Sequence, residues 1–349
     1  MHPTKKGIIL MNLGSPDSTS VKDVQKYLKE FLMDERVIDV PYFFRLLLIK
    51  GIIVPFRAPK SAEAYKTIWT DAGSPLIVLT QQLKEAVQQH IQMPVAVAMR
   101  YGNPSPEAAY QSLLDQNPDL EEVLLFPLYP HYAMSSYETA VEYMKEVHQK
   151  MNYKFKLKTI KPYYNHPEYI QALANSIQPY LQQEYDHILF SYHGIPERHI
   201  RKSDTTGFHC LQVKDCCNVP SVAHQTCYRH QVFETTKLVT EALQIPKEKF
   251  SISFQSRLGK GWLLPFTDKR LEEMPAQGIK KLLILCPAFV SDCLETLEEI
   301  AERGKESFME AGGESYTTIP CLNTQPLWIA VISKWVNDYK MSEKNMLLS

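Results

Sequence analysis

Eight short apolar runs of strand length alternate with helix-like patterns along this chain of 349 residues. A strand, then a helix, then another strand is the pattern of parallel sheets that have helices packed on both faces. We therefore predict an α/β fold built on parallel sheets. The predicted strands are Gly7–Leu13, Val95–Arg100, Val123–Leu128, Phe155–Ile160, His187–Tyr192, Phe250–Gln255, Lys281–Leu285 and Tyr316–Pro320. The predicted helices include Pro106–Leu114, Tyr137–Val147, Glu168–Leu181, Glu234–Leu243, Leu294–Phe308 and Pro326–Trp335.

The second half of the chain repeats short motifs of the first half. Matches that contain Gly and Pro arise easily by chance, but several matches in one register favour an internal duplication. We therefore predict two similar Rossmann-like, doubly wound domains, each with a four-stranded parallel sheet. A shift of 157 positions matches Arg100-Tyr101-Gly102 with Arg257-Leu258-Gly259, Pro130 with Pro287, Glu138 with Glu295, and Thr139 with Thr296, and a shift of 180 matches Asn12–Pro16 with Tyr192–Pro196.

Length and composition agree with two domains. A chain of 349 residues is long for a single hydrophobic core, and we place the halves at 1–162 and 163–325, with a C-terminal helix, 326–349, rejoining the first half. The net charge of −1 gives no general attraction to nucleic acid. The chain shows neither a secretory signal nor an apolar run of membrane-spanning length, so we expect a cytoplasmic protein.

Polar residues follow two of the predicted strands where those strands end. His193 ends the run before Gly194 and Pro196, and an acidic series of Asp292, Glu295, Glu299 and Glu302 follows Lys281–Leu285. Helical spacing would place these four carboxylates on one face. Ligands of open α/β sheets bind at the carboxyl ends of the strands. An imidazole near crowded carboxylates predicts a site that takes protons and accepts a divalent metal ion such as Fe²⁺. The plainer alternatives are a structural histidine and a solvated acidic helix.

Four of the seven cysteines lie within eighteen residues, in the order C-x5-C-C-x9-C. Clustered cysteines in a chain without an export signal point to metal binding rather than to disulfides. The spacing suits an iron–sulfur cluster or a structural zinc ion, and His209, His224 or His230 could replace one ligand. Unliganded thiols are the plainer alternative. The residues are Cys210, Cys216, Cys217 and Cys227, within an insert at 203–230.

The segment Val40–Phe56 is almost entirely apolar apart from Arg45 and Lys50. One interpretation is a buried core helix. The other is an apolar lip that touches lipid or a flat apolar substrate. Aromatic residues near predicted strand ends, including Tyr129, Phe254 and Trp262, could line a pocket for a large planar ligand, and Arg57 and Arg100 could pair with its carboxylates.

Together these motifs resemble the ferrochelatase family, whose members insert Fe²⁺ into a porphyrin. The resemblance runs from residue 8 to about 330, nearly the whole chain, and the pairing of S-Y-H-G-I-P with S-D-x-x-E-T is specific to that family. The matching segments are Met11–Pro16, Arg57–Lys60, Arg100–Gly102, Phe126–Tyr132, Ser191–Pro196, Phe254–Arg257, Trp262-Leu263 and Phe289–Thr296.

The resemblance implies roles for individual residues. It makes His193 and Glu295 the catalytic pair, and it places Asp292 and Glu299 with them on the path of the substrate iron. It also implies that Val40–Phe56 flanks the porphyrin entrance and touches the inner face of a membrane, where an upstream oxidase of the haem pathway could be a partner. Porphyrin-pocket positions match Leu13, Arg57, Tyr129, Phe254 and Trp262.

The chain also departs from the family pattern. Cys293 stands where some members have a histidine beside the metal path, and the tail after Trp335 lacks the cysteines that hold a cluster in animal members. We therefore expect a [2Fe–2S] cluster held wholly by the insert, as in some bacterial relatives, with structural zinc as the alternative.

The predicted activity is insertion of Fe²⁺ into protoporphyrin IX, which releases two protons and forms protohaem, the terminal step of haem synthesis. The alternatives are a coproporphyrin III ferrochelatase and another tetrapyrrole metal chelatase. From different classes, a haem- or metal-binding protein without turnover and a redox protein built on the cysteines remain open.

Overall fold

The computed structural model describes residues 5–257, 259–338 and 346–348. The chain forms two compact units, each built around its own sheet. Unit 1 comprises Met1–Tyr129, Met134–Lys161 and Ile329–Ser349, and unit 2 comprises Pro130–Ala133 and Pro162–Trp328.

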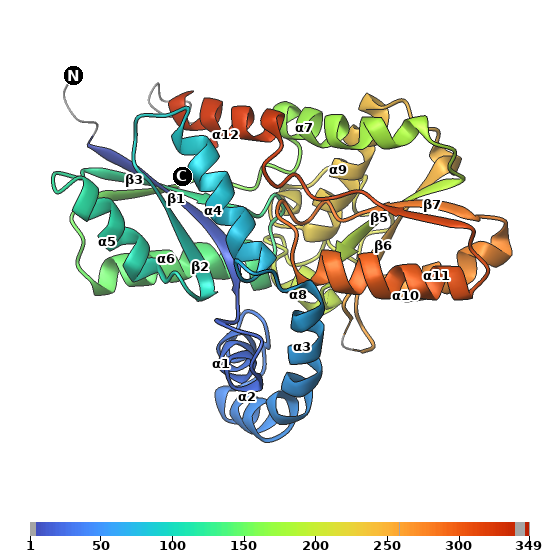
Figure 1. The fold of residues 1–349 in the computed structure, drawn as a ribbon, viewed down its shortest axis with the longest axis horizontal. Helices are drawn as coiled ribbons and strands as arrows, with labels where there is room; N and C mark the ends of the chain where they lie inside the picture. Colours follow the sequence, from blue (N-terminus) through green and yellow to red (C-terminus); the bar gives the residue numbers. More distant parts are fainter. Residues whose placement is uncertain (1–4, 258, 339–345, 349) are drawn as a thin grey trace. The chain divides into compact units, whose positions relative to one another are not determined.

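The sheet of unit 1 has the strand order β2-β1-β3-β4, and every neighbouring pair is parallel (Figure 1). In β1, Ile8 to Met11 are all fully buried. Continuous burial of this kind requires cover on both faces of the sheet, which is why these strands appear in the sequence as unbroken apolar runs. The strands are β1 (Lys6–Ser15), β2 (Val95–Gly102), β3 (Glu122–Pro127) and β4 (Lys156–Thr159).

Helices cover the two faces of this sheet, with α4 and α12 on one side and α5 and α6 on the other (Figure 1). Local sequence sets where α5 begins: the Ser105 side chain accepts from the backbone of Ala108, and Pro106 occupies the first turn. The elements are α1 (Val21–Leu32), α2 (Tyr42–Leu48), a π-helix at Ile49–Ile53, α3 (Val54–Ile68), α4 (Pro75–Gln88), α5 (Pro106–Gln116), a π-helix at Met134–Glu138, α6 (Thr139–Lys150) and α12 (Pro326–Asp338).

Unit 2 has the same topology, with the strand order β6-β5-β7-β8. Its first strand, β5, lies between its second and third strands, and its fourth strand, β8, lies at the edge next to the third, which is the arrangement of unit 1. This confirms the predicted fold of two similar four-stranded parallel sheets. The strands are β5 (His187–His193), β6 (Phe250–Gln255), β7 (Lys281–Leu285) and β8 (Ser315–Thr318).

Helices also cover both faces of the unit 2 sheet, with α7 and α9 on one face and α10 and α11 on the other (Figure 1). Leu271, Ile284 and Phe308 belong to one buried cluster between β7 and the second face. The elements are α7 (Pro167–Ile177), α8 (Glu197–Lys202), α9 (Tyr228–Ala242), α10 (Thr267–Glu273), a π-helix at Glu295–Gly304, α11 (Lys305–Glu310), and 3-10 turns at Gln178–Gln182, Val222–Gln225, Lys247–Lys249 and Met274–Gln277.

Two of the predicted helices differ markedly from the observed ones. The helix predicted at Glu168–Leu181 ends as an α-helix at Ile177, because Pro179 lacks a backbone N–H and disfavours the helical conformation of the residue before it. The helix predicted at Leu294–Phe308 is instead a π-helix over Glu295–Gly304 that continues as α11.

The segment Val40–Phe56 forms α2, the following π-helix and the start of α3, which lie beyond the edge of the unit 1 sheet (Figure 1). Its side chains are largely in solvent, with Phe43 64% and Phe56 76% exposed. The interpretation as a buried core helix is therefore wrong. Among the described residues, none of the helices combines the length and apolarity needed to cross a bilayer.

Candidate active site

His193 is the last residue of β5, and its imidazole is half-buried. Its Nδ1 lies 2.7 Å from the carbonyl oxygen of Gly194. A carbonyl oxygen only accepts hydrogen bonds, so Nδ1 carries the proton and Nε2 presents a lone pair when the ring is neutral. The fold therefore fixes His193 in the tautomer that suits a proton acceptor or a metal ligand.

The turn after His193 is held against β6. The Gly194 N–H donates to the Gln255 carbonyl oxygen at 2.8 Å. A Cβ atom at Gly194 would lie only 2.8 Å from that same oxygen, so a side chain cannot fit there without moving the backbone. This close approach explains why the motif needs glycine next to the histidine.

Glu299 is anchored by a single residue, Ser256. It accepts from the backbone N–H of Ser256 at 2.9 Å and also from the Ser256 hydroxyl. Ser256 has φ +62°, a left-handed conformation that costs a non-glycine residue free energy. The chain thus keeps a strained residue where it directs two donors at one carboxylate.

Burial raises the pKa of Glu299, and the nearby charge of Glu295 raises it further. The hydrogen bonds from Ser256 and the proximity of His193 oppose that rise. His193, Glu295 and Glu299 therefore lie within electrostatic reach of one another inside unit 2. Among the described residues, neither Glu295 nor Glu299 forms an ion pair. Arg303 is paired instead with Glu298, and its Nε lies 2.7 Å from the Glu298 Oε1.

Asp292 is buried, and its carboxylate is surrounded by donors from its own unit. It accepts from the Thr296 hydroxyl at 2.8 Å and from the Asn323 side-chain amide at 2.6 Å. The Asn323 side-chain oxygen in turn accepts from the Asp292 backbone N–H at 2.8 Å. These contacts fix the start of the π-helix that carries Glu295.

Glu302 does not share this environment, because its side chain is exposed. The prediction of one acidic helical face assumed α-helical spacing. A π-helix closes i→i+5 bonds and has a wider turn, so residues seven apart no longer align. For Glu302 the prediction of a shared face is wrong.

The pocket positions predicted in unit 2 lie beside His193. Phe254 is buried next to Gln255 in β6, and Trp262 forms an isolated β-bridge with Pro196, three residues after His193. The Trp262 ring also lies 3.4 Å from the position that a Cβ atom at residue Gly194 would occupy. Phe254 and Trp262 thus form apolar walls at the His193 turn.

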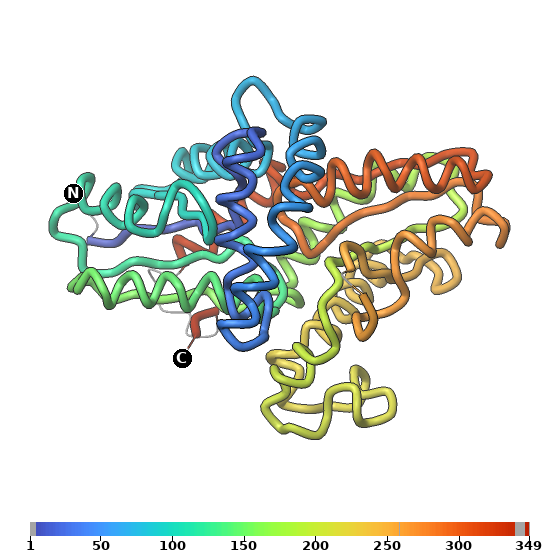
Figure 2. Tube along the Cα trace, turned by 90° about the horizontal axis from the view of Figure 1, so that it is seen from below, coloured from blue at the N-terminus to red at the C-terminus, as the bar shows by residue number. Residues whose placement is uncertain are grey.

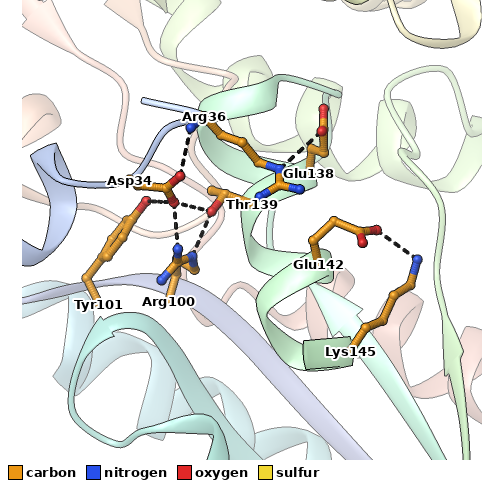
Figure 3. Close-up of polar contacts among 8 residues, drawn as sticks. All are labelled: Asp34, Arg36, Arg100, Tyr101, Glu138, Thr139, Glu142 and Lys145. Carbon is orange, nitrogen blue, oxygen red and sulfur yellow. Dashed lines mark hydrogen bonds and ion pairs between the residues drawn. The ribbon is translucent and has the colours of Figure 1, made fainter. Parts of the chain in front are cut away.

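In unit 1, Arg100 is part of a buried polar network (Figure 3). Its guanidinium lies 2.6 Å from the Asp34 carboxylate and 2.8 Å from the Thr139 hydroxyl, and the rings of Tyr101 and Tyr143 lie 4.3 Å from it. Hydrogen bonds from Thr139 and Tyr101 and the charge of Arg100 outweigh burial and lower the pKa of Asp34. The positive charge of Arg100 is therefore already compensated within its own unit.

The other positions predicted in unit 1 differ in exposure. Leu13 is half-buried near the end of β1, and Arg57 is exposed on α3. Tyr129 is buried, and its hydroxyl has no hydrogen-bond partner among the described residues. A buried hydroxyl without a partner is uncommon and is a plausible contact for a bound ligand.

The fold brings the four cysteines of the insert together. All four are buried, and the thiols of Cys210 and Cys217 both hydrogen-bond with that of Cys227. Two donors point at the sulfurs: the Leu211 N–H lies 3.3 Å from Cys216 Sγ, and the Arg229 guanidinium lies 3.3 Å from Cys217 Sγ. Burial raises the pKa of Cys210 to about 11. Figure 2 shows this loop, coloured yellow-green, extending from the body of unit 2.

Three histidines surround the backbone of the paired cysteines. Ring nitrogens of His209 and His224 bind the Cys216 carbonyl at 2.8 and 2.9 Å, and one of His230 binds the Cys217 carbonyl at 2.8 Å. Carbonyls only accept, so these nitrogens carry protons and shape the loop. In the described part of the chain, three or more His, Cys, Asp or Glu side chains are nowhere arranged as a metal-holding group.

Sequence reasoning missed the residues that hold this site in place. Ser256 and Asn323 carry no charge and give no sequence signal for their contacts with Glu299 and Asp292. Thr296 could have been found from the repeat, because its counterpart Thr139 also hydrogen-bonds an aspartate. Tyr228, whose hydroxyl lies 3.0 Å from the His193 carbonyl oxygen, gave no signal either.

Comparisons with known proteins agree on one family. The family model described as Ferrochelatase matches residues 5–340. A ferrochelatase of Opitutus terrae is 49% identical over 338 residues, covering 96% of this chain and 97% of its own length. One from Ectopseudomonas mendocina is 49% identical over 332 residues, covering 94% and 96%.

Solved structures of similar fold include the chelatase SirB. The sirohydrochlorin chelatase SirB from Bacillus subtilis subspecies spizizenii, in complex with cobalt, aligns over 99% of this chain and all of its own, with a TM-score of 0.55 and 9% identity. SirB from Bacillus subtilis with Fe³⁺ gives a TM-score of 0.53 at 12% identity, over 96% of this chain and 95% of its own. At such identities the likeness concerns the fold alone. The family match and the identities over nearly the full length show that this chain belongs to the ferrochelatase family, the enzymes that insert iron into porphyrin for haem synthesis.

Proposed function

We propose that the porphyrin substrate is protoporphyrin IX, that His193 is the proton acceptor, and that Glu295 is the carboxylate that faces the incoming Fe²⁺. One observation carries this proposal: His193 is held with its Nε2 lone pair free while the neighbouring Glu295 and Glu299 have no cationic partner in the described chain. Uncompensated carboxylates attract a dication, and a neutral imidazole accepts protons near neutral pH.

Two N–H protons must leave the porphyrin as iron enters. In our proposal His193 Nε2 takes the first, and the Gly194 carbonyl stabilises the resulting imidazolium through Nδ1–H. Glu299 takes the second, because a carboxyl whose pKa is raised by burial is a better proton acceptor than an ordinary surface carboxylate. Phe254 and Trp262 pack against the macrocycle, and tight packing can favour a bent ring whose nitrogens face the metal.

Asp292 takes a different part from the iron-path role that the resemblance implies. Its carboxylate is buried and accepts from Thr296 and Asn323, and its position at the start of the π-helix orients Glu295. Glu295 and Glu299, by contrast, are only half-buried. We propose that Asp292 acts by positioning, while Glu295 and Glu299 provide the oxygens for iron. Leu13, Arg57 and Tyr129 remain proposed porphyrin contacts. Arg100, already paired with Asp34, is the weakest candidate among them.

The exposed lip supports the choice of protoporphyrin, the less charged of the two candidate porphyrins. We propose that this lip rests on a membrane surface, where an apolar porphyrin would arrive from an upstream oxidase. Arg57 and Lys60, both exposed directly after it, could contact anionic headgroups. The exposed apolar side chains are Tyr42, Phe43, Phe44, Leu47, Leu48, Ile52 and Phe56.

We also propose that Cys210, Cys216, Cys217 and Cys227 hold a [2Fe–2S] cluster. The chemistry of the donors supports this proposal, although their side chains are not arranged as a metal-holding group in this structure: four buried cysteines lie in one loop, and a backbone N–H and a guanidinium point at two of the sulfurs. When bound, such a cluster supplies a one-electron redox centre. A visible spectrum bleached by dithionite, with matching iron and sulfide content, would support it; a colourless protein with stoichiometric zinc would exclude it.

The activity is tested by mixing the purified protein anaerobically with Fe²⁺ and either protoporphyrin IX or coproporphyrin III, while following the porphyrin absorbance. Multiple turnovers with protoporphyrin are expected. A strong preference for coproporphyrin would overturn the substrate assignment and leave the family assignment intact. Tight binding without turnover of either would indicate a carrier.

A further inference from the structure

The first turn of α9 connects the cysteine loop with the turn that holds His193. The helix begins at Tyr228, directly after Cys227, one of the four clustered cysteines. Tyr228 and its neighbour Arg229 have different partners: one reaches the backbone of His193, and the other reaches cysteine sulfurs. Two adjacent residues at the start of one helix thus contact both sites.

Tyr228 is 4% exposed, and its hydroxyl donates to the His193 carbonyl oxygen at 3.0 Å. Its ring packs edge-on against His131 at 6.0 Å, and His131 packs in the same way against Tyr192 at 5.6 Å. A side chain packed on its ring and bonded at its tip has little freedom to move by itself. A shift of Tyr228 would therefore require a shift of the helix start.

The peptide that follows His193 is held from both sides. Its carbonyl accepts from Tyr228, and its N–H, which belongs to Gly194, donates to Gln255. The next carbonyl, that of Gly194, accepts from His193 Nδ1. Since the imidazole is bonded to this same short stretch of backbone, a displacement of the Tyr228 hydroxyl changes where His193 Nε2 points.

Arg229 provides the connection to the sulfurs. Its guanidinium lies 3.3 Å from Cys217 Sγ and 3.8 Å from Cys216 Sγ, with the Phe233 ring 4.8 Å away. A guanidinium is always cationic, so its attraction to the sulfurs grows as negative charge accumulates on them. A change in the charge of the cysteine loop therefore acts on the residue next to Tyr228.

We infer that Tyr228 is a positioning residue that couples the redox state of the cysteine loop to the position of His193. The inference rests on the [2Fe–2S] cluster proposed above. If an external one-electron donor such as dithionite reduces the bound cluster, the cysteine sulfurs would carry more negative charge, Arg229 would be attracted to them more strongly, and the start of α9 would shift. Tyr228 transmits that shift to the His193 carbonyl. Porphyrin affinity then differs between the oxidised and the reduced protein.

Coupling between two sites is reciprocal, so porphyrin binding must also change the reduction potential of the cluster. For a one-electron couple, a tenfold difference in porphyrin affinity between the two redox states appears as a shift of about 59 mV. This shift is measured on full-length protein by redox titration, with and without protoporphyrin IX and without added iron. Following the electron paramagnetic resonance signal of the reduced cluster avoids interference from porphyrin absorbance.

Tyr228→Phe removes only the hydroxyl that contacts His193. Tyr169→Phe is the matched control, because Tyr169 is also buried in unit 2 and donates to a backbone carbonyl, that of Pro287, at 3.0 Å. We expect the porphyrin-induced shift in the wild type and in Tyr169→Phe, and its loss in Tyr228→Phe with iron and sulfide content unchanged. Tyr228→Phe should also lower kcat by about tenfold, since misplacing a catalytic group slows chemistry.

Other outcomes would overturn the inference in distinguishable ways. Wild-type protein without iron and sulfide would remove the proposed cluster itself. A cluster whose potential ignores porphyrin would leave the cofactor in place and refute the coupling. An equal shift in the wild type and in Tyr228→Phe would show that the coupling does not pass through this hydroxyl.

Discussion

Glu138 and Glu295 occupy matching positions in π-helices of the two units, but of the two only Glu138 has an arginine partner among the described residues. The two residues are 157 positions apart, and Arg36 Nε lies 3.2 Å from the Glu138 carboxylate. The same shift relates Glu142 to Glu299, and Glu142 is paired with Lys145 at 2.9 Å (Figure 3). The acidic motif is therefore neutralised in unit 1, whereas in the described part of unit 2 its counterparts carry no ion pair.

This difference makes Glu138→Gln a control for Glu295→Gln. Glu295→Gln keeps the shape and removes the charge that faces iron, so we expect kcat/KM for Fe²⁺ to fall by about 100-fold or more. Glu138→Gln removes a half-exposed ion pair and should change stability by no more than about 1 kcal/mol with activity retained. Steady-state kinetics with varied Fe²⁺ and urea unfolding measure both. Wild-type kinetics in Glu295→Gln would remove that residue from the mechanism.

His193→Ala should separate binding from chemistry. Removing the proton acceptor is expected to lower kcat by about 10²–10⁴-fold. The protein should still bind porphyrin through Phe254 and Trp262, with its affinity lowered by about tenfold at most. Turnover assays and porphyrin fluorescence titration give the two quantities. If turnover stayed near the wild-type level, the proton acceptor would have to be another residue.

Asn323→Ala tests the positioning role of Asp292. The change removes the amide that donates to Asp292 at 2.6 Å and leaves part of a buried carboxylate unpaired. We expect a loss of about 1–3 kcal/mol in the free energy of unfolding. Because Glu295 follows on the π-helix, kcat should fall as well, whereas porphyrin binding should not. An Asn323→Asp protein that matched the wild type at neutral pH would contradict this account, because it would place two carboxylates together.

His131 predicts how stability depends on pH. Burial lowers its pKa to about 3. Its Nε2 lies 2.9 Å from the Thr235 hydroxyl, which itself donates to the Tyr164 carbonyl, so Nε2 carries the proton and Nδ1 is a buried acceptor without a partner in the described chain. Protonating Nδ1 would bury an unpaired charge.

The direction follows from linkage. Below its ordinary pKa of about 6.5, His131 binds a proton in the unfolded chain but not in the folded one, so stability is full above pH 6.5 and falls as the pH drops toward 3. Between pH 7.5 and 5.5 this residue alone should cost about 1.4 kcal/mol. Urea unfolding of the wild type and of His131→Gln at both pH values measures it. Equal pH dependence in the two proteins would disprove the assignment.

The lip predicts membrane binding that depends on aromatic side chains. Phe43 and Phe44 are 64% and 65% exposed, and replacing both with serine removes two large apolar groups from a membrane contact. We expect affinity for anionic vesicles to fall roughly 100-fold. Phe208→Ser is the control, because Phe208 is 69% exposed but lies on the cysteine insert. Vesicle flotation with equal recovery of all three proteins would argue against the lip as the contact.

The sheets were predictable from the sequence because strands buried on both faces need continuous apolar runs, as in Ile8–Met11. His193 and Glu295 became candidate site residues because polar residues follow strand ends at one edge of a sheet. The support of the site was not predictable. Ser256 reaches Glu299 across 43 residues, and Arg100 reaches Asp34 across 66, through folding that no local pattern encodes.

The π-helix was missed for a related reason. The spacing of Asp292, Glu295 and Glu299 fits an α-helix as well as a wider one. Packing offers one account of the difference: Gly304 allows Tyr316 to approach so closely that a Cβ atom would lie 2.7 Å from its hydroxyl, which donates to the Ile300 carbonyl at 2.7 Å. Such a contact depends on β8, which follows later in the chain.

The duplication confines electrostatic strain to one half of the molecule. Crowded anions without counterions weaken a fold, and unit 1 avoids that weakness because Arg36 and Lys145 balance its copy of the acidic motif. Unit 2 retains the imbalance, which a bound dication would relieve. The same topology thus occurs once with its acidic motif balanced and once in a half whose stability we expect to rise when a dication binds its carboxylates.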